Sequence, residues 1–168
     1  MLNFAYGSNL LEERLLARVP QARFVGIGWL IGWRFALNIR STDGSAKANA
    51  IYTGRPEEVL HGALYELDGA GKAVLDRFED VGGAYRIEQA TAETASGARE
   101  VYLYVGNASR FVENLPPYDW YLGFILAGAR QRGLPAEFIE RLEAVRALPD
   151  PDVRRAATNW NLIPPHQL

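Results

Sequence analysis

The sequence predicts an α+β fold in which the strands come first and the helices last. Segments typical of β-strands, rich in Phe, Val, Ile, Trp and Tyr, occupy most of the first two-thirds of the 168 residues. The last third instead repeats apolar residues at the helical period, over residues 118–132 and 135–147. Strands and helices that are segregated along a chain favour α+β over a doubly wound sheet, in which they would alternate.

The chain opens with a predicted strand, a tight turn and a helix. Residues 2–5 are apolar, residues 6–9 (YGSN) are small or polar, and leucines then recur at helical spacing over residues 11–16. We expect Ser8 or Asn9 to be the N-cap of this helix. A turn of this kind directs unpaired main-chain N–H groups at one point, which suits an anion or a developing oxyanion.

Glycines interrupt the next strand segment, residues 23–39, at Gly26, Gly28 and Gly32. Glycines within a strand pattern mark bulges or sharp bends, so the segment is predicted to be two strands or one bent strand. A dinucleotide-binding loop is disfavoured, because no helix start follows Gly28.

The same patterns predict the remaining elements. Residues 85–93 and 99–105 alternate apolar and polar side chains around an Ala-Ser-Gly turn and are predicted to form a hairpin. The tail after Pro149 is predicted to be irregular and to lie on the surface of the domain. The other predicted elements are a turn at 41–45, strands at 48–53 and 59–67, and helices at 70–79, 118–132 and 135–147.

The composition is that of one globular domain, spanning residues 1–168. The chain is 48% hydrophobic and 23% charged with a formal net charge of -2, which gives no electrostatic basis for binding nucleic acid or a membrane surface. It has no cysteine, which excludes disulfides, thiolate zinc sites and cysteine nucleophiles. No signal peptide or membrane-spanning pattern is recognised, and we expect a soluble, cytoplasmic protein.

Few side chains qualify as nucleophiles or metal ligands. Ser8 is a candidate nucleophile, but the second glycine of a G-x-S-x-G elbow is missing and only His61 and His166 could serve as its base. Two isolated histidines make no convincing metal site, so no metal is predicted.

Glu79 is the more informative residue. It lies at the edge of the apolar stripe of the predicted helix 70–79. There it is either a solvated carboxylate in the last turn or a partly buried acid that exchanges protons near neutral pH. Tyr85 and Tyr121 are ambiguous in the same way, since an aromatic side chain beside a loop either packs in the core or orients a polar substrate.

Three segments resemble the γ-glutamylcyclotransferase family. The opening FAYGSNL, residues 4–10, is similar to the family's signature loop. LDRFEDVGGAYRI, residues 75–87, is similar to the segment around the family's catalytic glutamate, with a tyrosine six residues after it, although Asp80 replaces a common glycine. YLGFILAGARQRGLPAEFIERLEAV, residues 121–145, is similar to the family's C-terminal helices. The three blocks occur in the family's order and span most of the chain.

The resemblance implies a small mixed β-barrel with peripheral helices, no cofactor, no metal and a homodimer, for which the apolar tail residues Trp160 and Ile163 are interface candidates. It implies an enzyme that converts a γ-glutamyl amino acid into 5-oxoproline and a free amine, by attack of the substrate's α-amine on its own γ-carbonyl. Glu79 is then the general acid and base. The implied substrate-binding residues are Tyr6, Gly7, Ser8, Asn9, Leu10, Tyr85 and Tyr121.

Alternatives stay open at this point. The same chemistry applies to a γ-glutamyl amine or to a γ-glutamylated biosynthetic intermediate. A non-catalytic binding or regulatory module of the same fold is also considered, although the retained Glu79 argues against it. A glutathione-specific member is disfavoured, because Asn9 stands where that branch has a Y-G-S-L loop. The sequence does not show which of four residues face the leaving group: Asn38, Arg40, Arg86 or Trp120.

Overall fold

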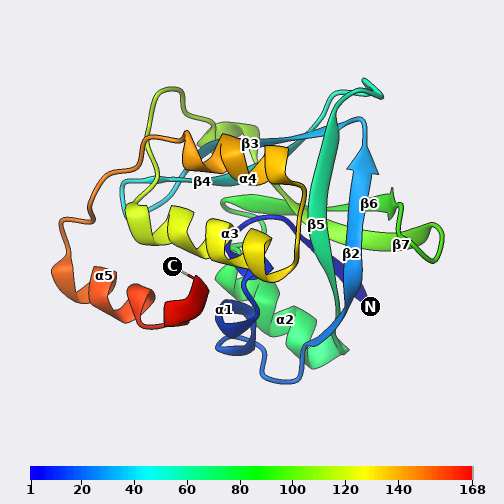
Figure 1. The fold of residues 1–168 in the computed structure, drawn as a ribbon, viewed down its shortest axis with the longest axis horizontal. Helices are drawn as coiled ribbons and strands as arrows, with labels where there is room; N and C mark the ends of the chain where they lie inside the picture. The colour runs from blue at the N-terminus through cyan, green and yellow to red at the C-terminus, as the bar shows by residue number, and fades with distance from the viewer. Residues whose placement is uncertain (168) are drawn as a thin grey trace.

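A five-stranded mixed sheet is the centre of the computed structural model, which describes residues 1–167 (Figure 1). Its strands are β1 (Leu2–Ala5), β2 (Arg23–Ile31), β5 (Val59–Glu66), β6 (Tyr85–Ala92) and β7 (Arg99–Gly106). They lie in the order β2-β5-β1-β7-β6. The central β1 is antiparallel to β5 and parallel to β7, so that β1 and β7 end at the same edge of the sheet.

A second, two-stranded sheet lies at that edge. It consists of β3 (Trp33–Arg40) and β4 (Ala46–Tyr52), which pair antiparallel. A side chain joins it to the large sheet, because the Oδ1 atom of Asn49 in β4 accepts a 2.8 Å hydrogen bond from the N–H of Gly106 at the end of β7. The small sheet therefore covers the point where β1 gives way to the YGSN turn.

The glycine pattern of residues 23–39 is explained by a bulge and a sharp turn. The register of β2 against β5 shifts between Phe24 and Gly26, as at a β-bulge. Gly32 separates β2 from β3 and has a φ of 80°, a left-handed conformation that favours glycine. The segment is thus two strands, one of the two arrangements predicted.

The α+β class and the β6–β7 hairpin are confirmed, whereas a closed barrel is not. The outer strand β2 meets Glu93, the residue that follows the other outer strand β6, at one isolated bridge. At this bridge the main-chain N–H groups of Trp29 and Glu93 each donate to the other residue's carbonyl at 2.9 Å. A single bridge curls the sheet without forming a continuous ladder between its first and last strands.

The helices lie mainly to one side of the large sheet, toward the left and bottom of the view in Figure 1. They are α1 (Glu12–Leu16), α2 (Gly69–Phe78), α3 (Asp119–Gln131), α4 (Ala136–Glu143) and α5 (Val153–Trp160). The longest, α3, packs directly on the backbone after the YGSN turn, since a Cβ at Gly128 would lie 2.4 Å from the main-chain nitrogen of Leu11. Within residues 1–167, no helix has the length and apolar character needed to cross a bilayer.

Two sequence predictions about helix boundaries are wrong. Ser8 and Asn9 do not cap α1, because they lie inside a short 3₁₀ helix, η1 (Ser8–Leu10), and Leu11 occupies the N-cap position without a capping side chain. The tail is not irregular throughout, because it contains α5. The N-cap of α5 is Asp152, whose carboxylate accepts hydrogen bonds from two N–H groups in the first turn.

The apolar residues of the tail pack against their own chain. Ile163 is only 3% exposed, and Trp160 packs against the same core. Both side chains pack against Gly123 of α3, so a larger residue at position 123 would displace them. Ile163 is therefore not available to a partner, and Trp160 is only partly exposed, so these two residues give the homodimer prediction little support.

Candidate functional site

The turn after β1 presents three main-chain N–H groups without partners. The N–H of Leu10 donates to the carbonyl of Gly7 at 3.0 Å, which closes the turn of η1. The N–H groups of Gly7, Ser8 and Asn9 donate to no acceptor within residues 1–167. Gly7 itself lies against β4, because a Cβ there would be 3.0 Å from the Cβ of Ala48. Three unpaired donors on consecutive residues of one turn can bind a carbonyl oxygen or an anion.

The carboxylate of Glu79 lies beside this turn. Glu79 is the C-cap residue of α2, and its side chain is 16% exposed. Its Oε1 atom accepts two hydrogen bonds of 2.9 Å, one from Nδ2 of Asn9 and one from Nη1 of Arg18. The same Arg18 nitrogen also donates to Oδ1 of Asn9 at 3.0 Å, which closes a triangle of three side chains.

This triangle fixes one oxygen of Glu79 and leaves the other available. Both hydrogen bonds go to Oε1, and Oε2 accepts none from residues 1–167. Of the two possibilities considered for Glu79 from the sequence, the burial of its side chain agrees with the partly buried acid and not with the solvated carboxylate, whereas its proton exchange remains a prediction. Oε2 is the atom that can exchange a proton with a bound molecule.

Tyr85 and Tyr121 bind the main chain of one residue from opposite sides. The Tyr121 hydroxyl accepts a 2.9 Å hydrogen bond from the N–H of Ala48, and the Tyr85 hydroxyl donates to the carbonyl of Ala48 at 2.7 Å. Neither forms a hydrogen bond with Glu79. Burial raises the pKa of both phenols, so both remain protonated at neutral pH. Because Tyr121 uses its oxygen as the acceptor, its own proton is free to be donated to a ligand.

Two adjoining cavities meet at these side chains. The inner cavity has a volume of about 30 Å³, room for about two water-sized groups. The outer cavity has a volume of about 250 Å³ and shares four lining residues with the inner one: Ser8, Glu79, Tyr85 and Tyr121. The inner cavity is lined in addition by Asn3, Phe4, Ala5, Tyr6, Gly7, Asn9, Ala48 and Tyr104.

The comparisons with known proteins agree on one family. Residues 59–142 match the model of the AIG2-like family. The human protein named gamma-glutamylcyclotransferase is 30% identical over 150 residues, which cover 86% of this chain and 78% of that protein. The bovine protein of the same name is 29% identical over the same shares. The chain belongs to the γ-glutamylcyclotransferase family. A solved structure named gamma-glutamyl cyclotransferase has a TM-score of 0.80 and 25% sequence identity, covering 94% of this chain and 98% of that one.

The site residues expected of a γ-glutamylcyclotransferase meet here with one exception. Tyr6, Gly7 and Asn9 line the inner cavity, and the four shared residues line both. Leu10 does not line either cavity: its side chain is fully buried in the core, and its carbonyl accepts a hydrogen bond from the Tyr65 hydroxyl. The contribution of Leu10 to this site is packing beneath the turn.

Basic side chains predominate in the outer cavity of this γ-glutamylcyclotransferase relative. Of the four residues that the sequence left open, Arg40 and Trp120 line this cavity, whereas Asn38 and Arg86 do not. Five basic residues line it against three acidic ones: Arg14, Arg18, Arg40, Lys47 and Arg110, with Asp43, Glu79 and Asp80.

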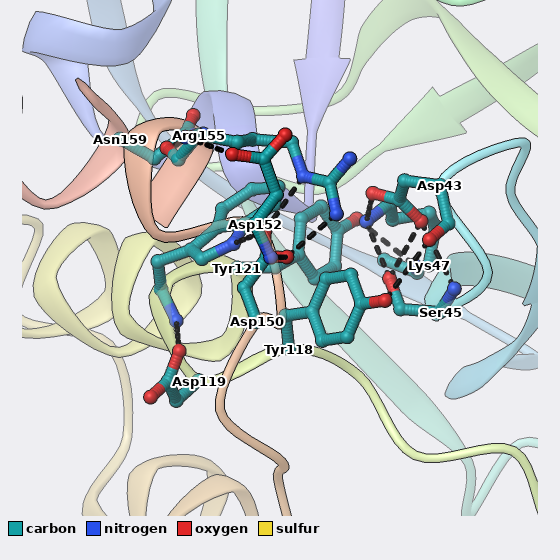
Figure 2. A network of polar contacts seen from close by, with 12 residues as sticks. Asp43, Ser45, Lys47, Tyr118, Asp119, Tyr121, Asp150, Asp152, Arg155 and Asn159 are labelled. Atoms are coloured by element: carbon teal, nitrogen blue, oxygen red, sulfur yellow. Dashed lines mark hydrogen bonds and ion pairs between the residues drawn. The ribbon is translucent and has the colours of Figure 1, made fainter. Parts of the chain in front are cut away.

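A polar network holds the outer wall of the cavity (Figure 2). Nζ of Lys47 is 2.6 Å from Oδ2 of Asp43 and lies 4.5 Å from the centre of the Tyr121 ring. Behind this wall the indole N–H of Trp120 donates to the buried carboxylate of Asp150 at 2.7 Å. Arg155 of α5 pairs with the same carboxylate at 2.6 Å. The tail segment thus supports the residues that face the cavity.

The serine-nucleophile alternative lacks a base. Neither His61 nor His166 lines the two cavities that contain Ser8. His61 lines a separate cavity of about 840 Å³, between β2, β3, β5 and α4, that contains none of the predicted site residues. No group of three or more His, Asp or Glu side chains in the described part of the chain is placed to hold a metal ion.

The sequence interpretation missed the basic residues Arg14 and Arg18. They are spaced four residues apart, at the end of α1 and just after it, directly downstream of the YGSN turn. A pair of arginines at that spacing places two positive charges on the side of the helix that faces the turn. This spacing is the sequence signal that could have identified the two arginines. It points to the site only once Glu79, 61 residues after Arg18, is known to lie beside them.

Proposed function

We propose that the protein is a cofactor-independent γ-glutamylcyclotransferase that releases 5-oxoproline from a γ-glutamyl amino acid. The observation that carries the proposal is the position of the free Oε2 of Glu79 beside a turn with three unpaired N–H groups. A carbonyl bound by those donors would lie next to a carboxylate that can move protons. The membership of the family, whose human and bovine relatives bear the enzyme's name, supports the same reaction.

The reaction forms one carbon–nitrogen bond and breaks another. The α-amine of the substrate attacks the γ-carbonyl carbon and closes a five-membered lactam, and the bond from that carbon to the leaving nitrogen breaks. The α-ammonium loses two of its three protons overall, and the leaving nitrogen gains two to depart as an ammonium. Water is not a reactant. No oxidation or reduction takes place.

Glu79 is proposed to carry those protons. Its Oε2 takes a proton from the α-ammonium and returns it to the leaving nitrogen, which is general base and then general acid catalysis by one group. Asn9 and Arg18 hold Oε1, so Oε2 stays directed at the substrate. Because the attack is intramolecular, much of the rate gain comes from holding the substrate in its folded conformer.

The turn and Tyr121 are proposed to stabilise the oxyanion. The γ-carbonyl oxygen acquires negative charge as the tetrahedral species forms, and the N–H groups of Gly7, Ser8 and Asn9 are available to it. The free proton of the Tyr121 hydroxyl is a further donor at the same place, since a Cβ at Gly7 would lie 3.5 Å from that oxygen. The small inner cavity suits the reacting end of the substrate.

The excess of basic side chains in the outer cavity favours an amino acid as the leaving group over an uncharged amine. An amino acid carries a carboxylate, which five basic residues would attract. A γ-glutamyl amine lacks that group, and the non-catalytic alternative gives no reason for Glu79 to keep a free oxygen.

The proposal is tested by incubating purified protein with a panel of γ-glutamyl amino acids and γ-glutamyl amines, without added metal. Mass spectrometry should detect 5-oxoproline and the free amino acid in equal amounts, with activity unchanged by a chelator. Release of glutamate instead of 5-oxoproline would show hydrolysis and contradict the cyclisation. Activity that is lost with a chelator and restored by zinc would contradict the mechanism.

A further inference from the structure

Arg14 carries a partly buried positive charge that forms no ion pair within residues 1–167. Its guanidinium lies 4.7 Å from the centre of the Phe124 ring, and Nη1 donates to the amide oxygen of Asn159 at 3.2 Å. Its Nε is buried and donates to no acceptor. Of the other cations that line the outer cavity, Arg18 pairs with Glu79 and Lys47 pairs with Asp43. Arg40 and Arg110 form no ion pair within residues 1–167 either, but Arg40 is exposed to solvent and Arg110 is only half-buried.

A charge in this position is costly unless something neutralises it. Burial, with the nearby charge of Arg18, lowers the pKa of Arg14 to about 10, so the guanidinium remains protonated at neutral pH. An unpaired buried cation destabilises the fold, and an anion bound next to it would remove that penalty. The neutral amide of Asn159 satisfies one N–H of Arg14 without supplying a counter-charge, and the nearby carboxylate of Glu79, which pairs with Arg18, offsets only part of the cost.

The position of Arg14 relative to the two cavities indicates which anion it would meet. Arg14 lines the outer cavity and not the inner one, which the turn and Glu79 enclose. If the reacting carbonyl occupies the inner cavity, the leaving group extends into the outer cavity. A carboxylate on the leaving group would then be the anion nearest to Arg14.

We propose that Arg14 binds the carboxylate of the leaving amino acid and is the residue that makes this site specific for γ-glutamyl amino acids. The inference rests on the proposed function, and it adds a role for α5. Asn159, in the last turn of α5, holds Arg14 in place on Phe124. The tail helix therefore positions the residue that recognises the leaving group.

The test compares two substrates that differ in one charge: γ-glutamyl-alanine and its C-terminal carboxamide. Arg14→Met removes the charge and keeps a long apolar side chain, and Arg130→Met, at an exposed ion pair with Glu143, is the matched control. Arg14→Met should lower kcat/KM for γ-glutamyl-alanine by about 10–100-fold, mainly through KM, with little change for the carboxamide. Arg130→Met should leave the ratio of the two substrates as in the wild type.

An equal loss on both substrates would overturn the inference, because it would assign Arg14 to the reaction or to the fold. If Arg14→Met does not fold, Asn159→Ala is used instead, and it should shift the substrate ratio in the same direction. An unchanged ratio in that variant would equally reject the inference. If the wild type releases no 5-oxoproline, the proposed function fails. In that case the role of Arg14 is tested separately, by calorimetric titration of the wild type and of Arg14→Met with γ-glutamyl-alanine. Arg14→Met should weaken binding by about tenfold or more, and equal binding by the two proteins would reject the inference.

Discussion

Glu79→Gln removes a proton carrier with little change in shape. The amide oxygen of glutamine can still accept the two 2.9 Å hydrogen bonds that Asn9 and Arg18 donate to Oε1. An NH₂ group replaces Oε2, and an amide cannot take up a proton near neutral pH. The variant therefore keeps the hydrogen-bonded geometry and loses the base.

The expected loss of activity follows from the proposed role. General acid–base catalysis contributes about 10²–10⁴-fold, so kcat should fall by about that factor. This corresponds to about 3–5 kcal/mol on the activation barrier. KM should change much less, because Glu79 is proposed to move protons and not to hold the glutamyl group.

The expected loss of stability is small by comparison. The side chains of Arg18 and Glu79 are 12% and 16% exposed, so water screens their ion pair only in part. The hydrogen bond from Asn9 becomes a neutral one and the bond from Arg18 loses its anionic acceptor, which should lower the free energy of unfolding by about 1–2 kcal/mol. For a chain of this length the melting temperature should fall by about 2–8 °C.

The assay is steady-state release of 5-oxoproline, with thermal unfolding followed in parallel. Glu143→Gln is the matched control, because this exposed carboxylate pairs with Arg130 and neither residue lines either cavity. It should retain full activity and unfold within about 1 kcal/mol of the wild type. Nearly full activity in Glu79→Gln would refute the acid–base role, and equal losses in both variants would show that overall charge matters and not this carboxylate.

Two further predictions concern stability. Gly128→Ala would place a Cβ 2.4 Å from the nitrogen of Leu11, so it should lower the free energy of unfolding by about 1–3 kcal/mol, as measured by urea unfolding. The control is Gly69→Ala in α2, where a Cβ would meet open space, and this variant should be neutral or stabilising. The hydrogen bond from Arg155 holds the pKa of Asp150 well below its usual range, so this pair stabilises the fold above about pH 4 and is lost as the pH falls further. Acid unfolding of Asp150→Asn should therefore depend less on pH than that of the wild type, and an unchanged profile would contradict the assignment.

The parts of the fold that depend on near neighbours could be predicted from the sequence. Alternation and turn residues placed the strands to within about two residues, including the β6–β7 hairpin. The spacing of Leu75 and Glu79 on one helical face placed the carboxylate at an apolar edge. The order of the strands in the sheet could not be predicted in this way, because it depends on contacts between segments far apart in the chain.

The missed features have physical reasons of the same kind. Arg18 matters because it reaches a carboxylate 61 residues away, and no local pattern encodes that contact. Helix α5 was missed because it is short, two of its four apolar residues are alanines, and its first residue, Val153, is 76% exposed. A charged pair between Arg155 and Asp150 helps to hold it, together with the packing of Trp160 on the core. The cap prediction at Ser8 failed because the turn tightened into a 3₁₀ helix before α1 began.

Ala48 has no reactive side chain, yet both of its main-chain polar groups are bound by tyrosines from other elements. Tyr85 begins β6 and Tyr121 lies in α3, so the small sheet is joined to the large sheet and to a helix through one residue. Separating these layers would break both buried hydrogen bonds at once, and the amide of Ala48 would then exchange its hydrogen only in a broad opening of the fold. The walls around the inner cavity are therefore assembled when the chain folds, and a substrate that binds there meets a surface that is already rigid.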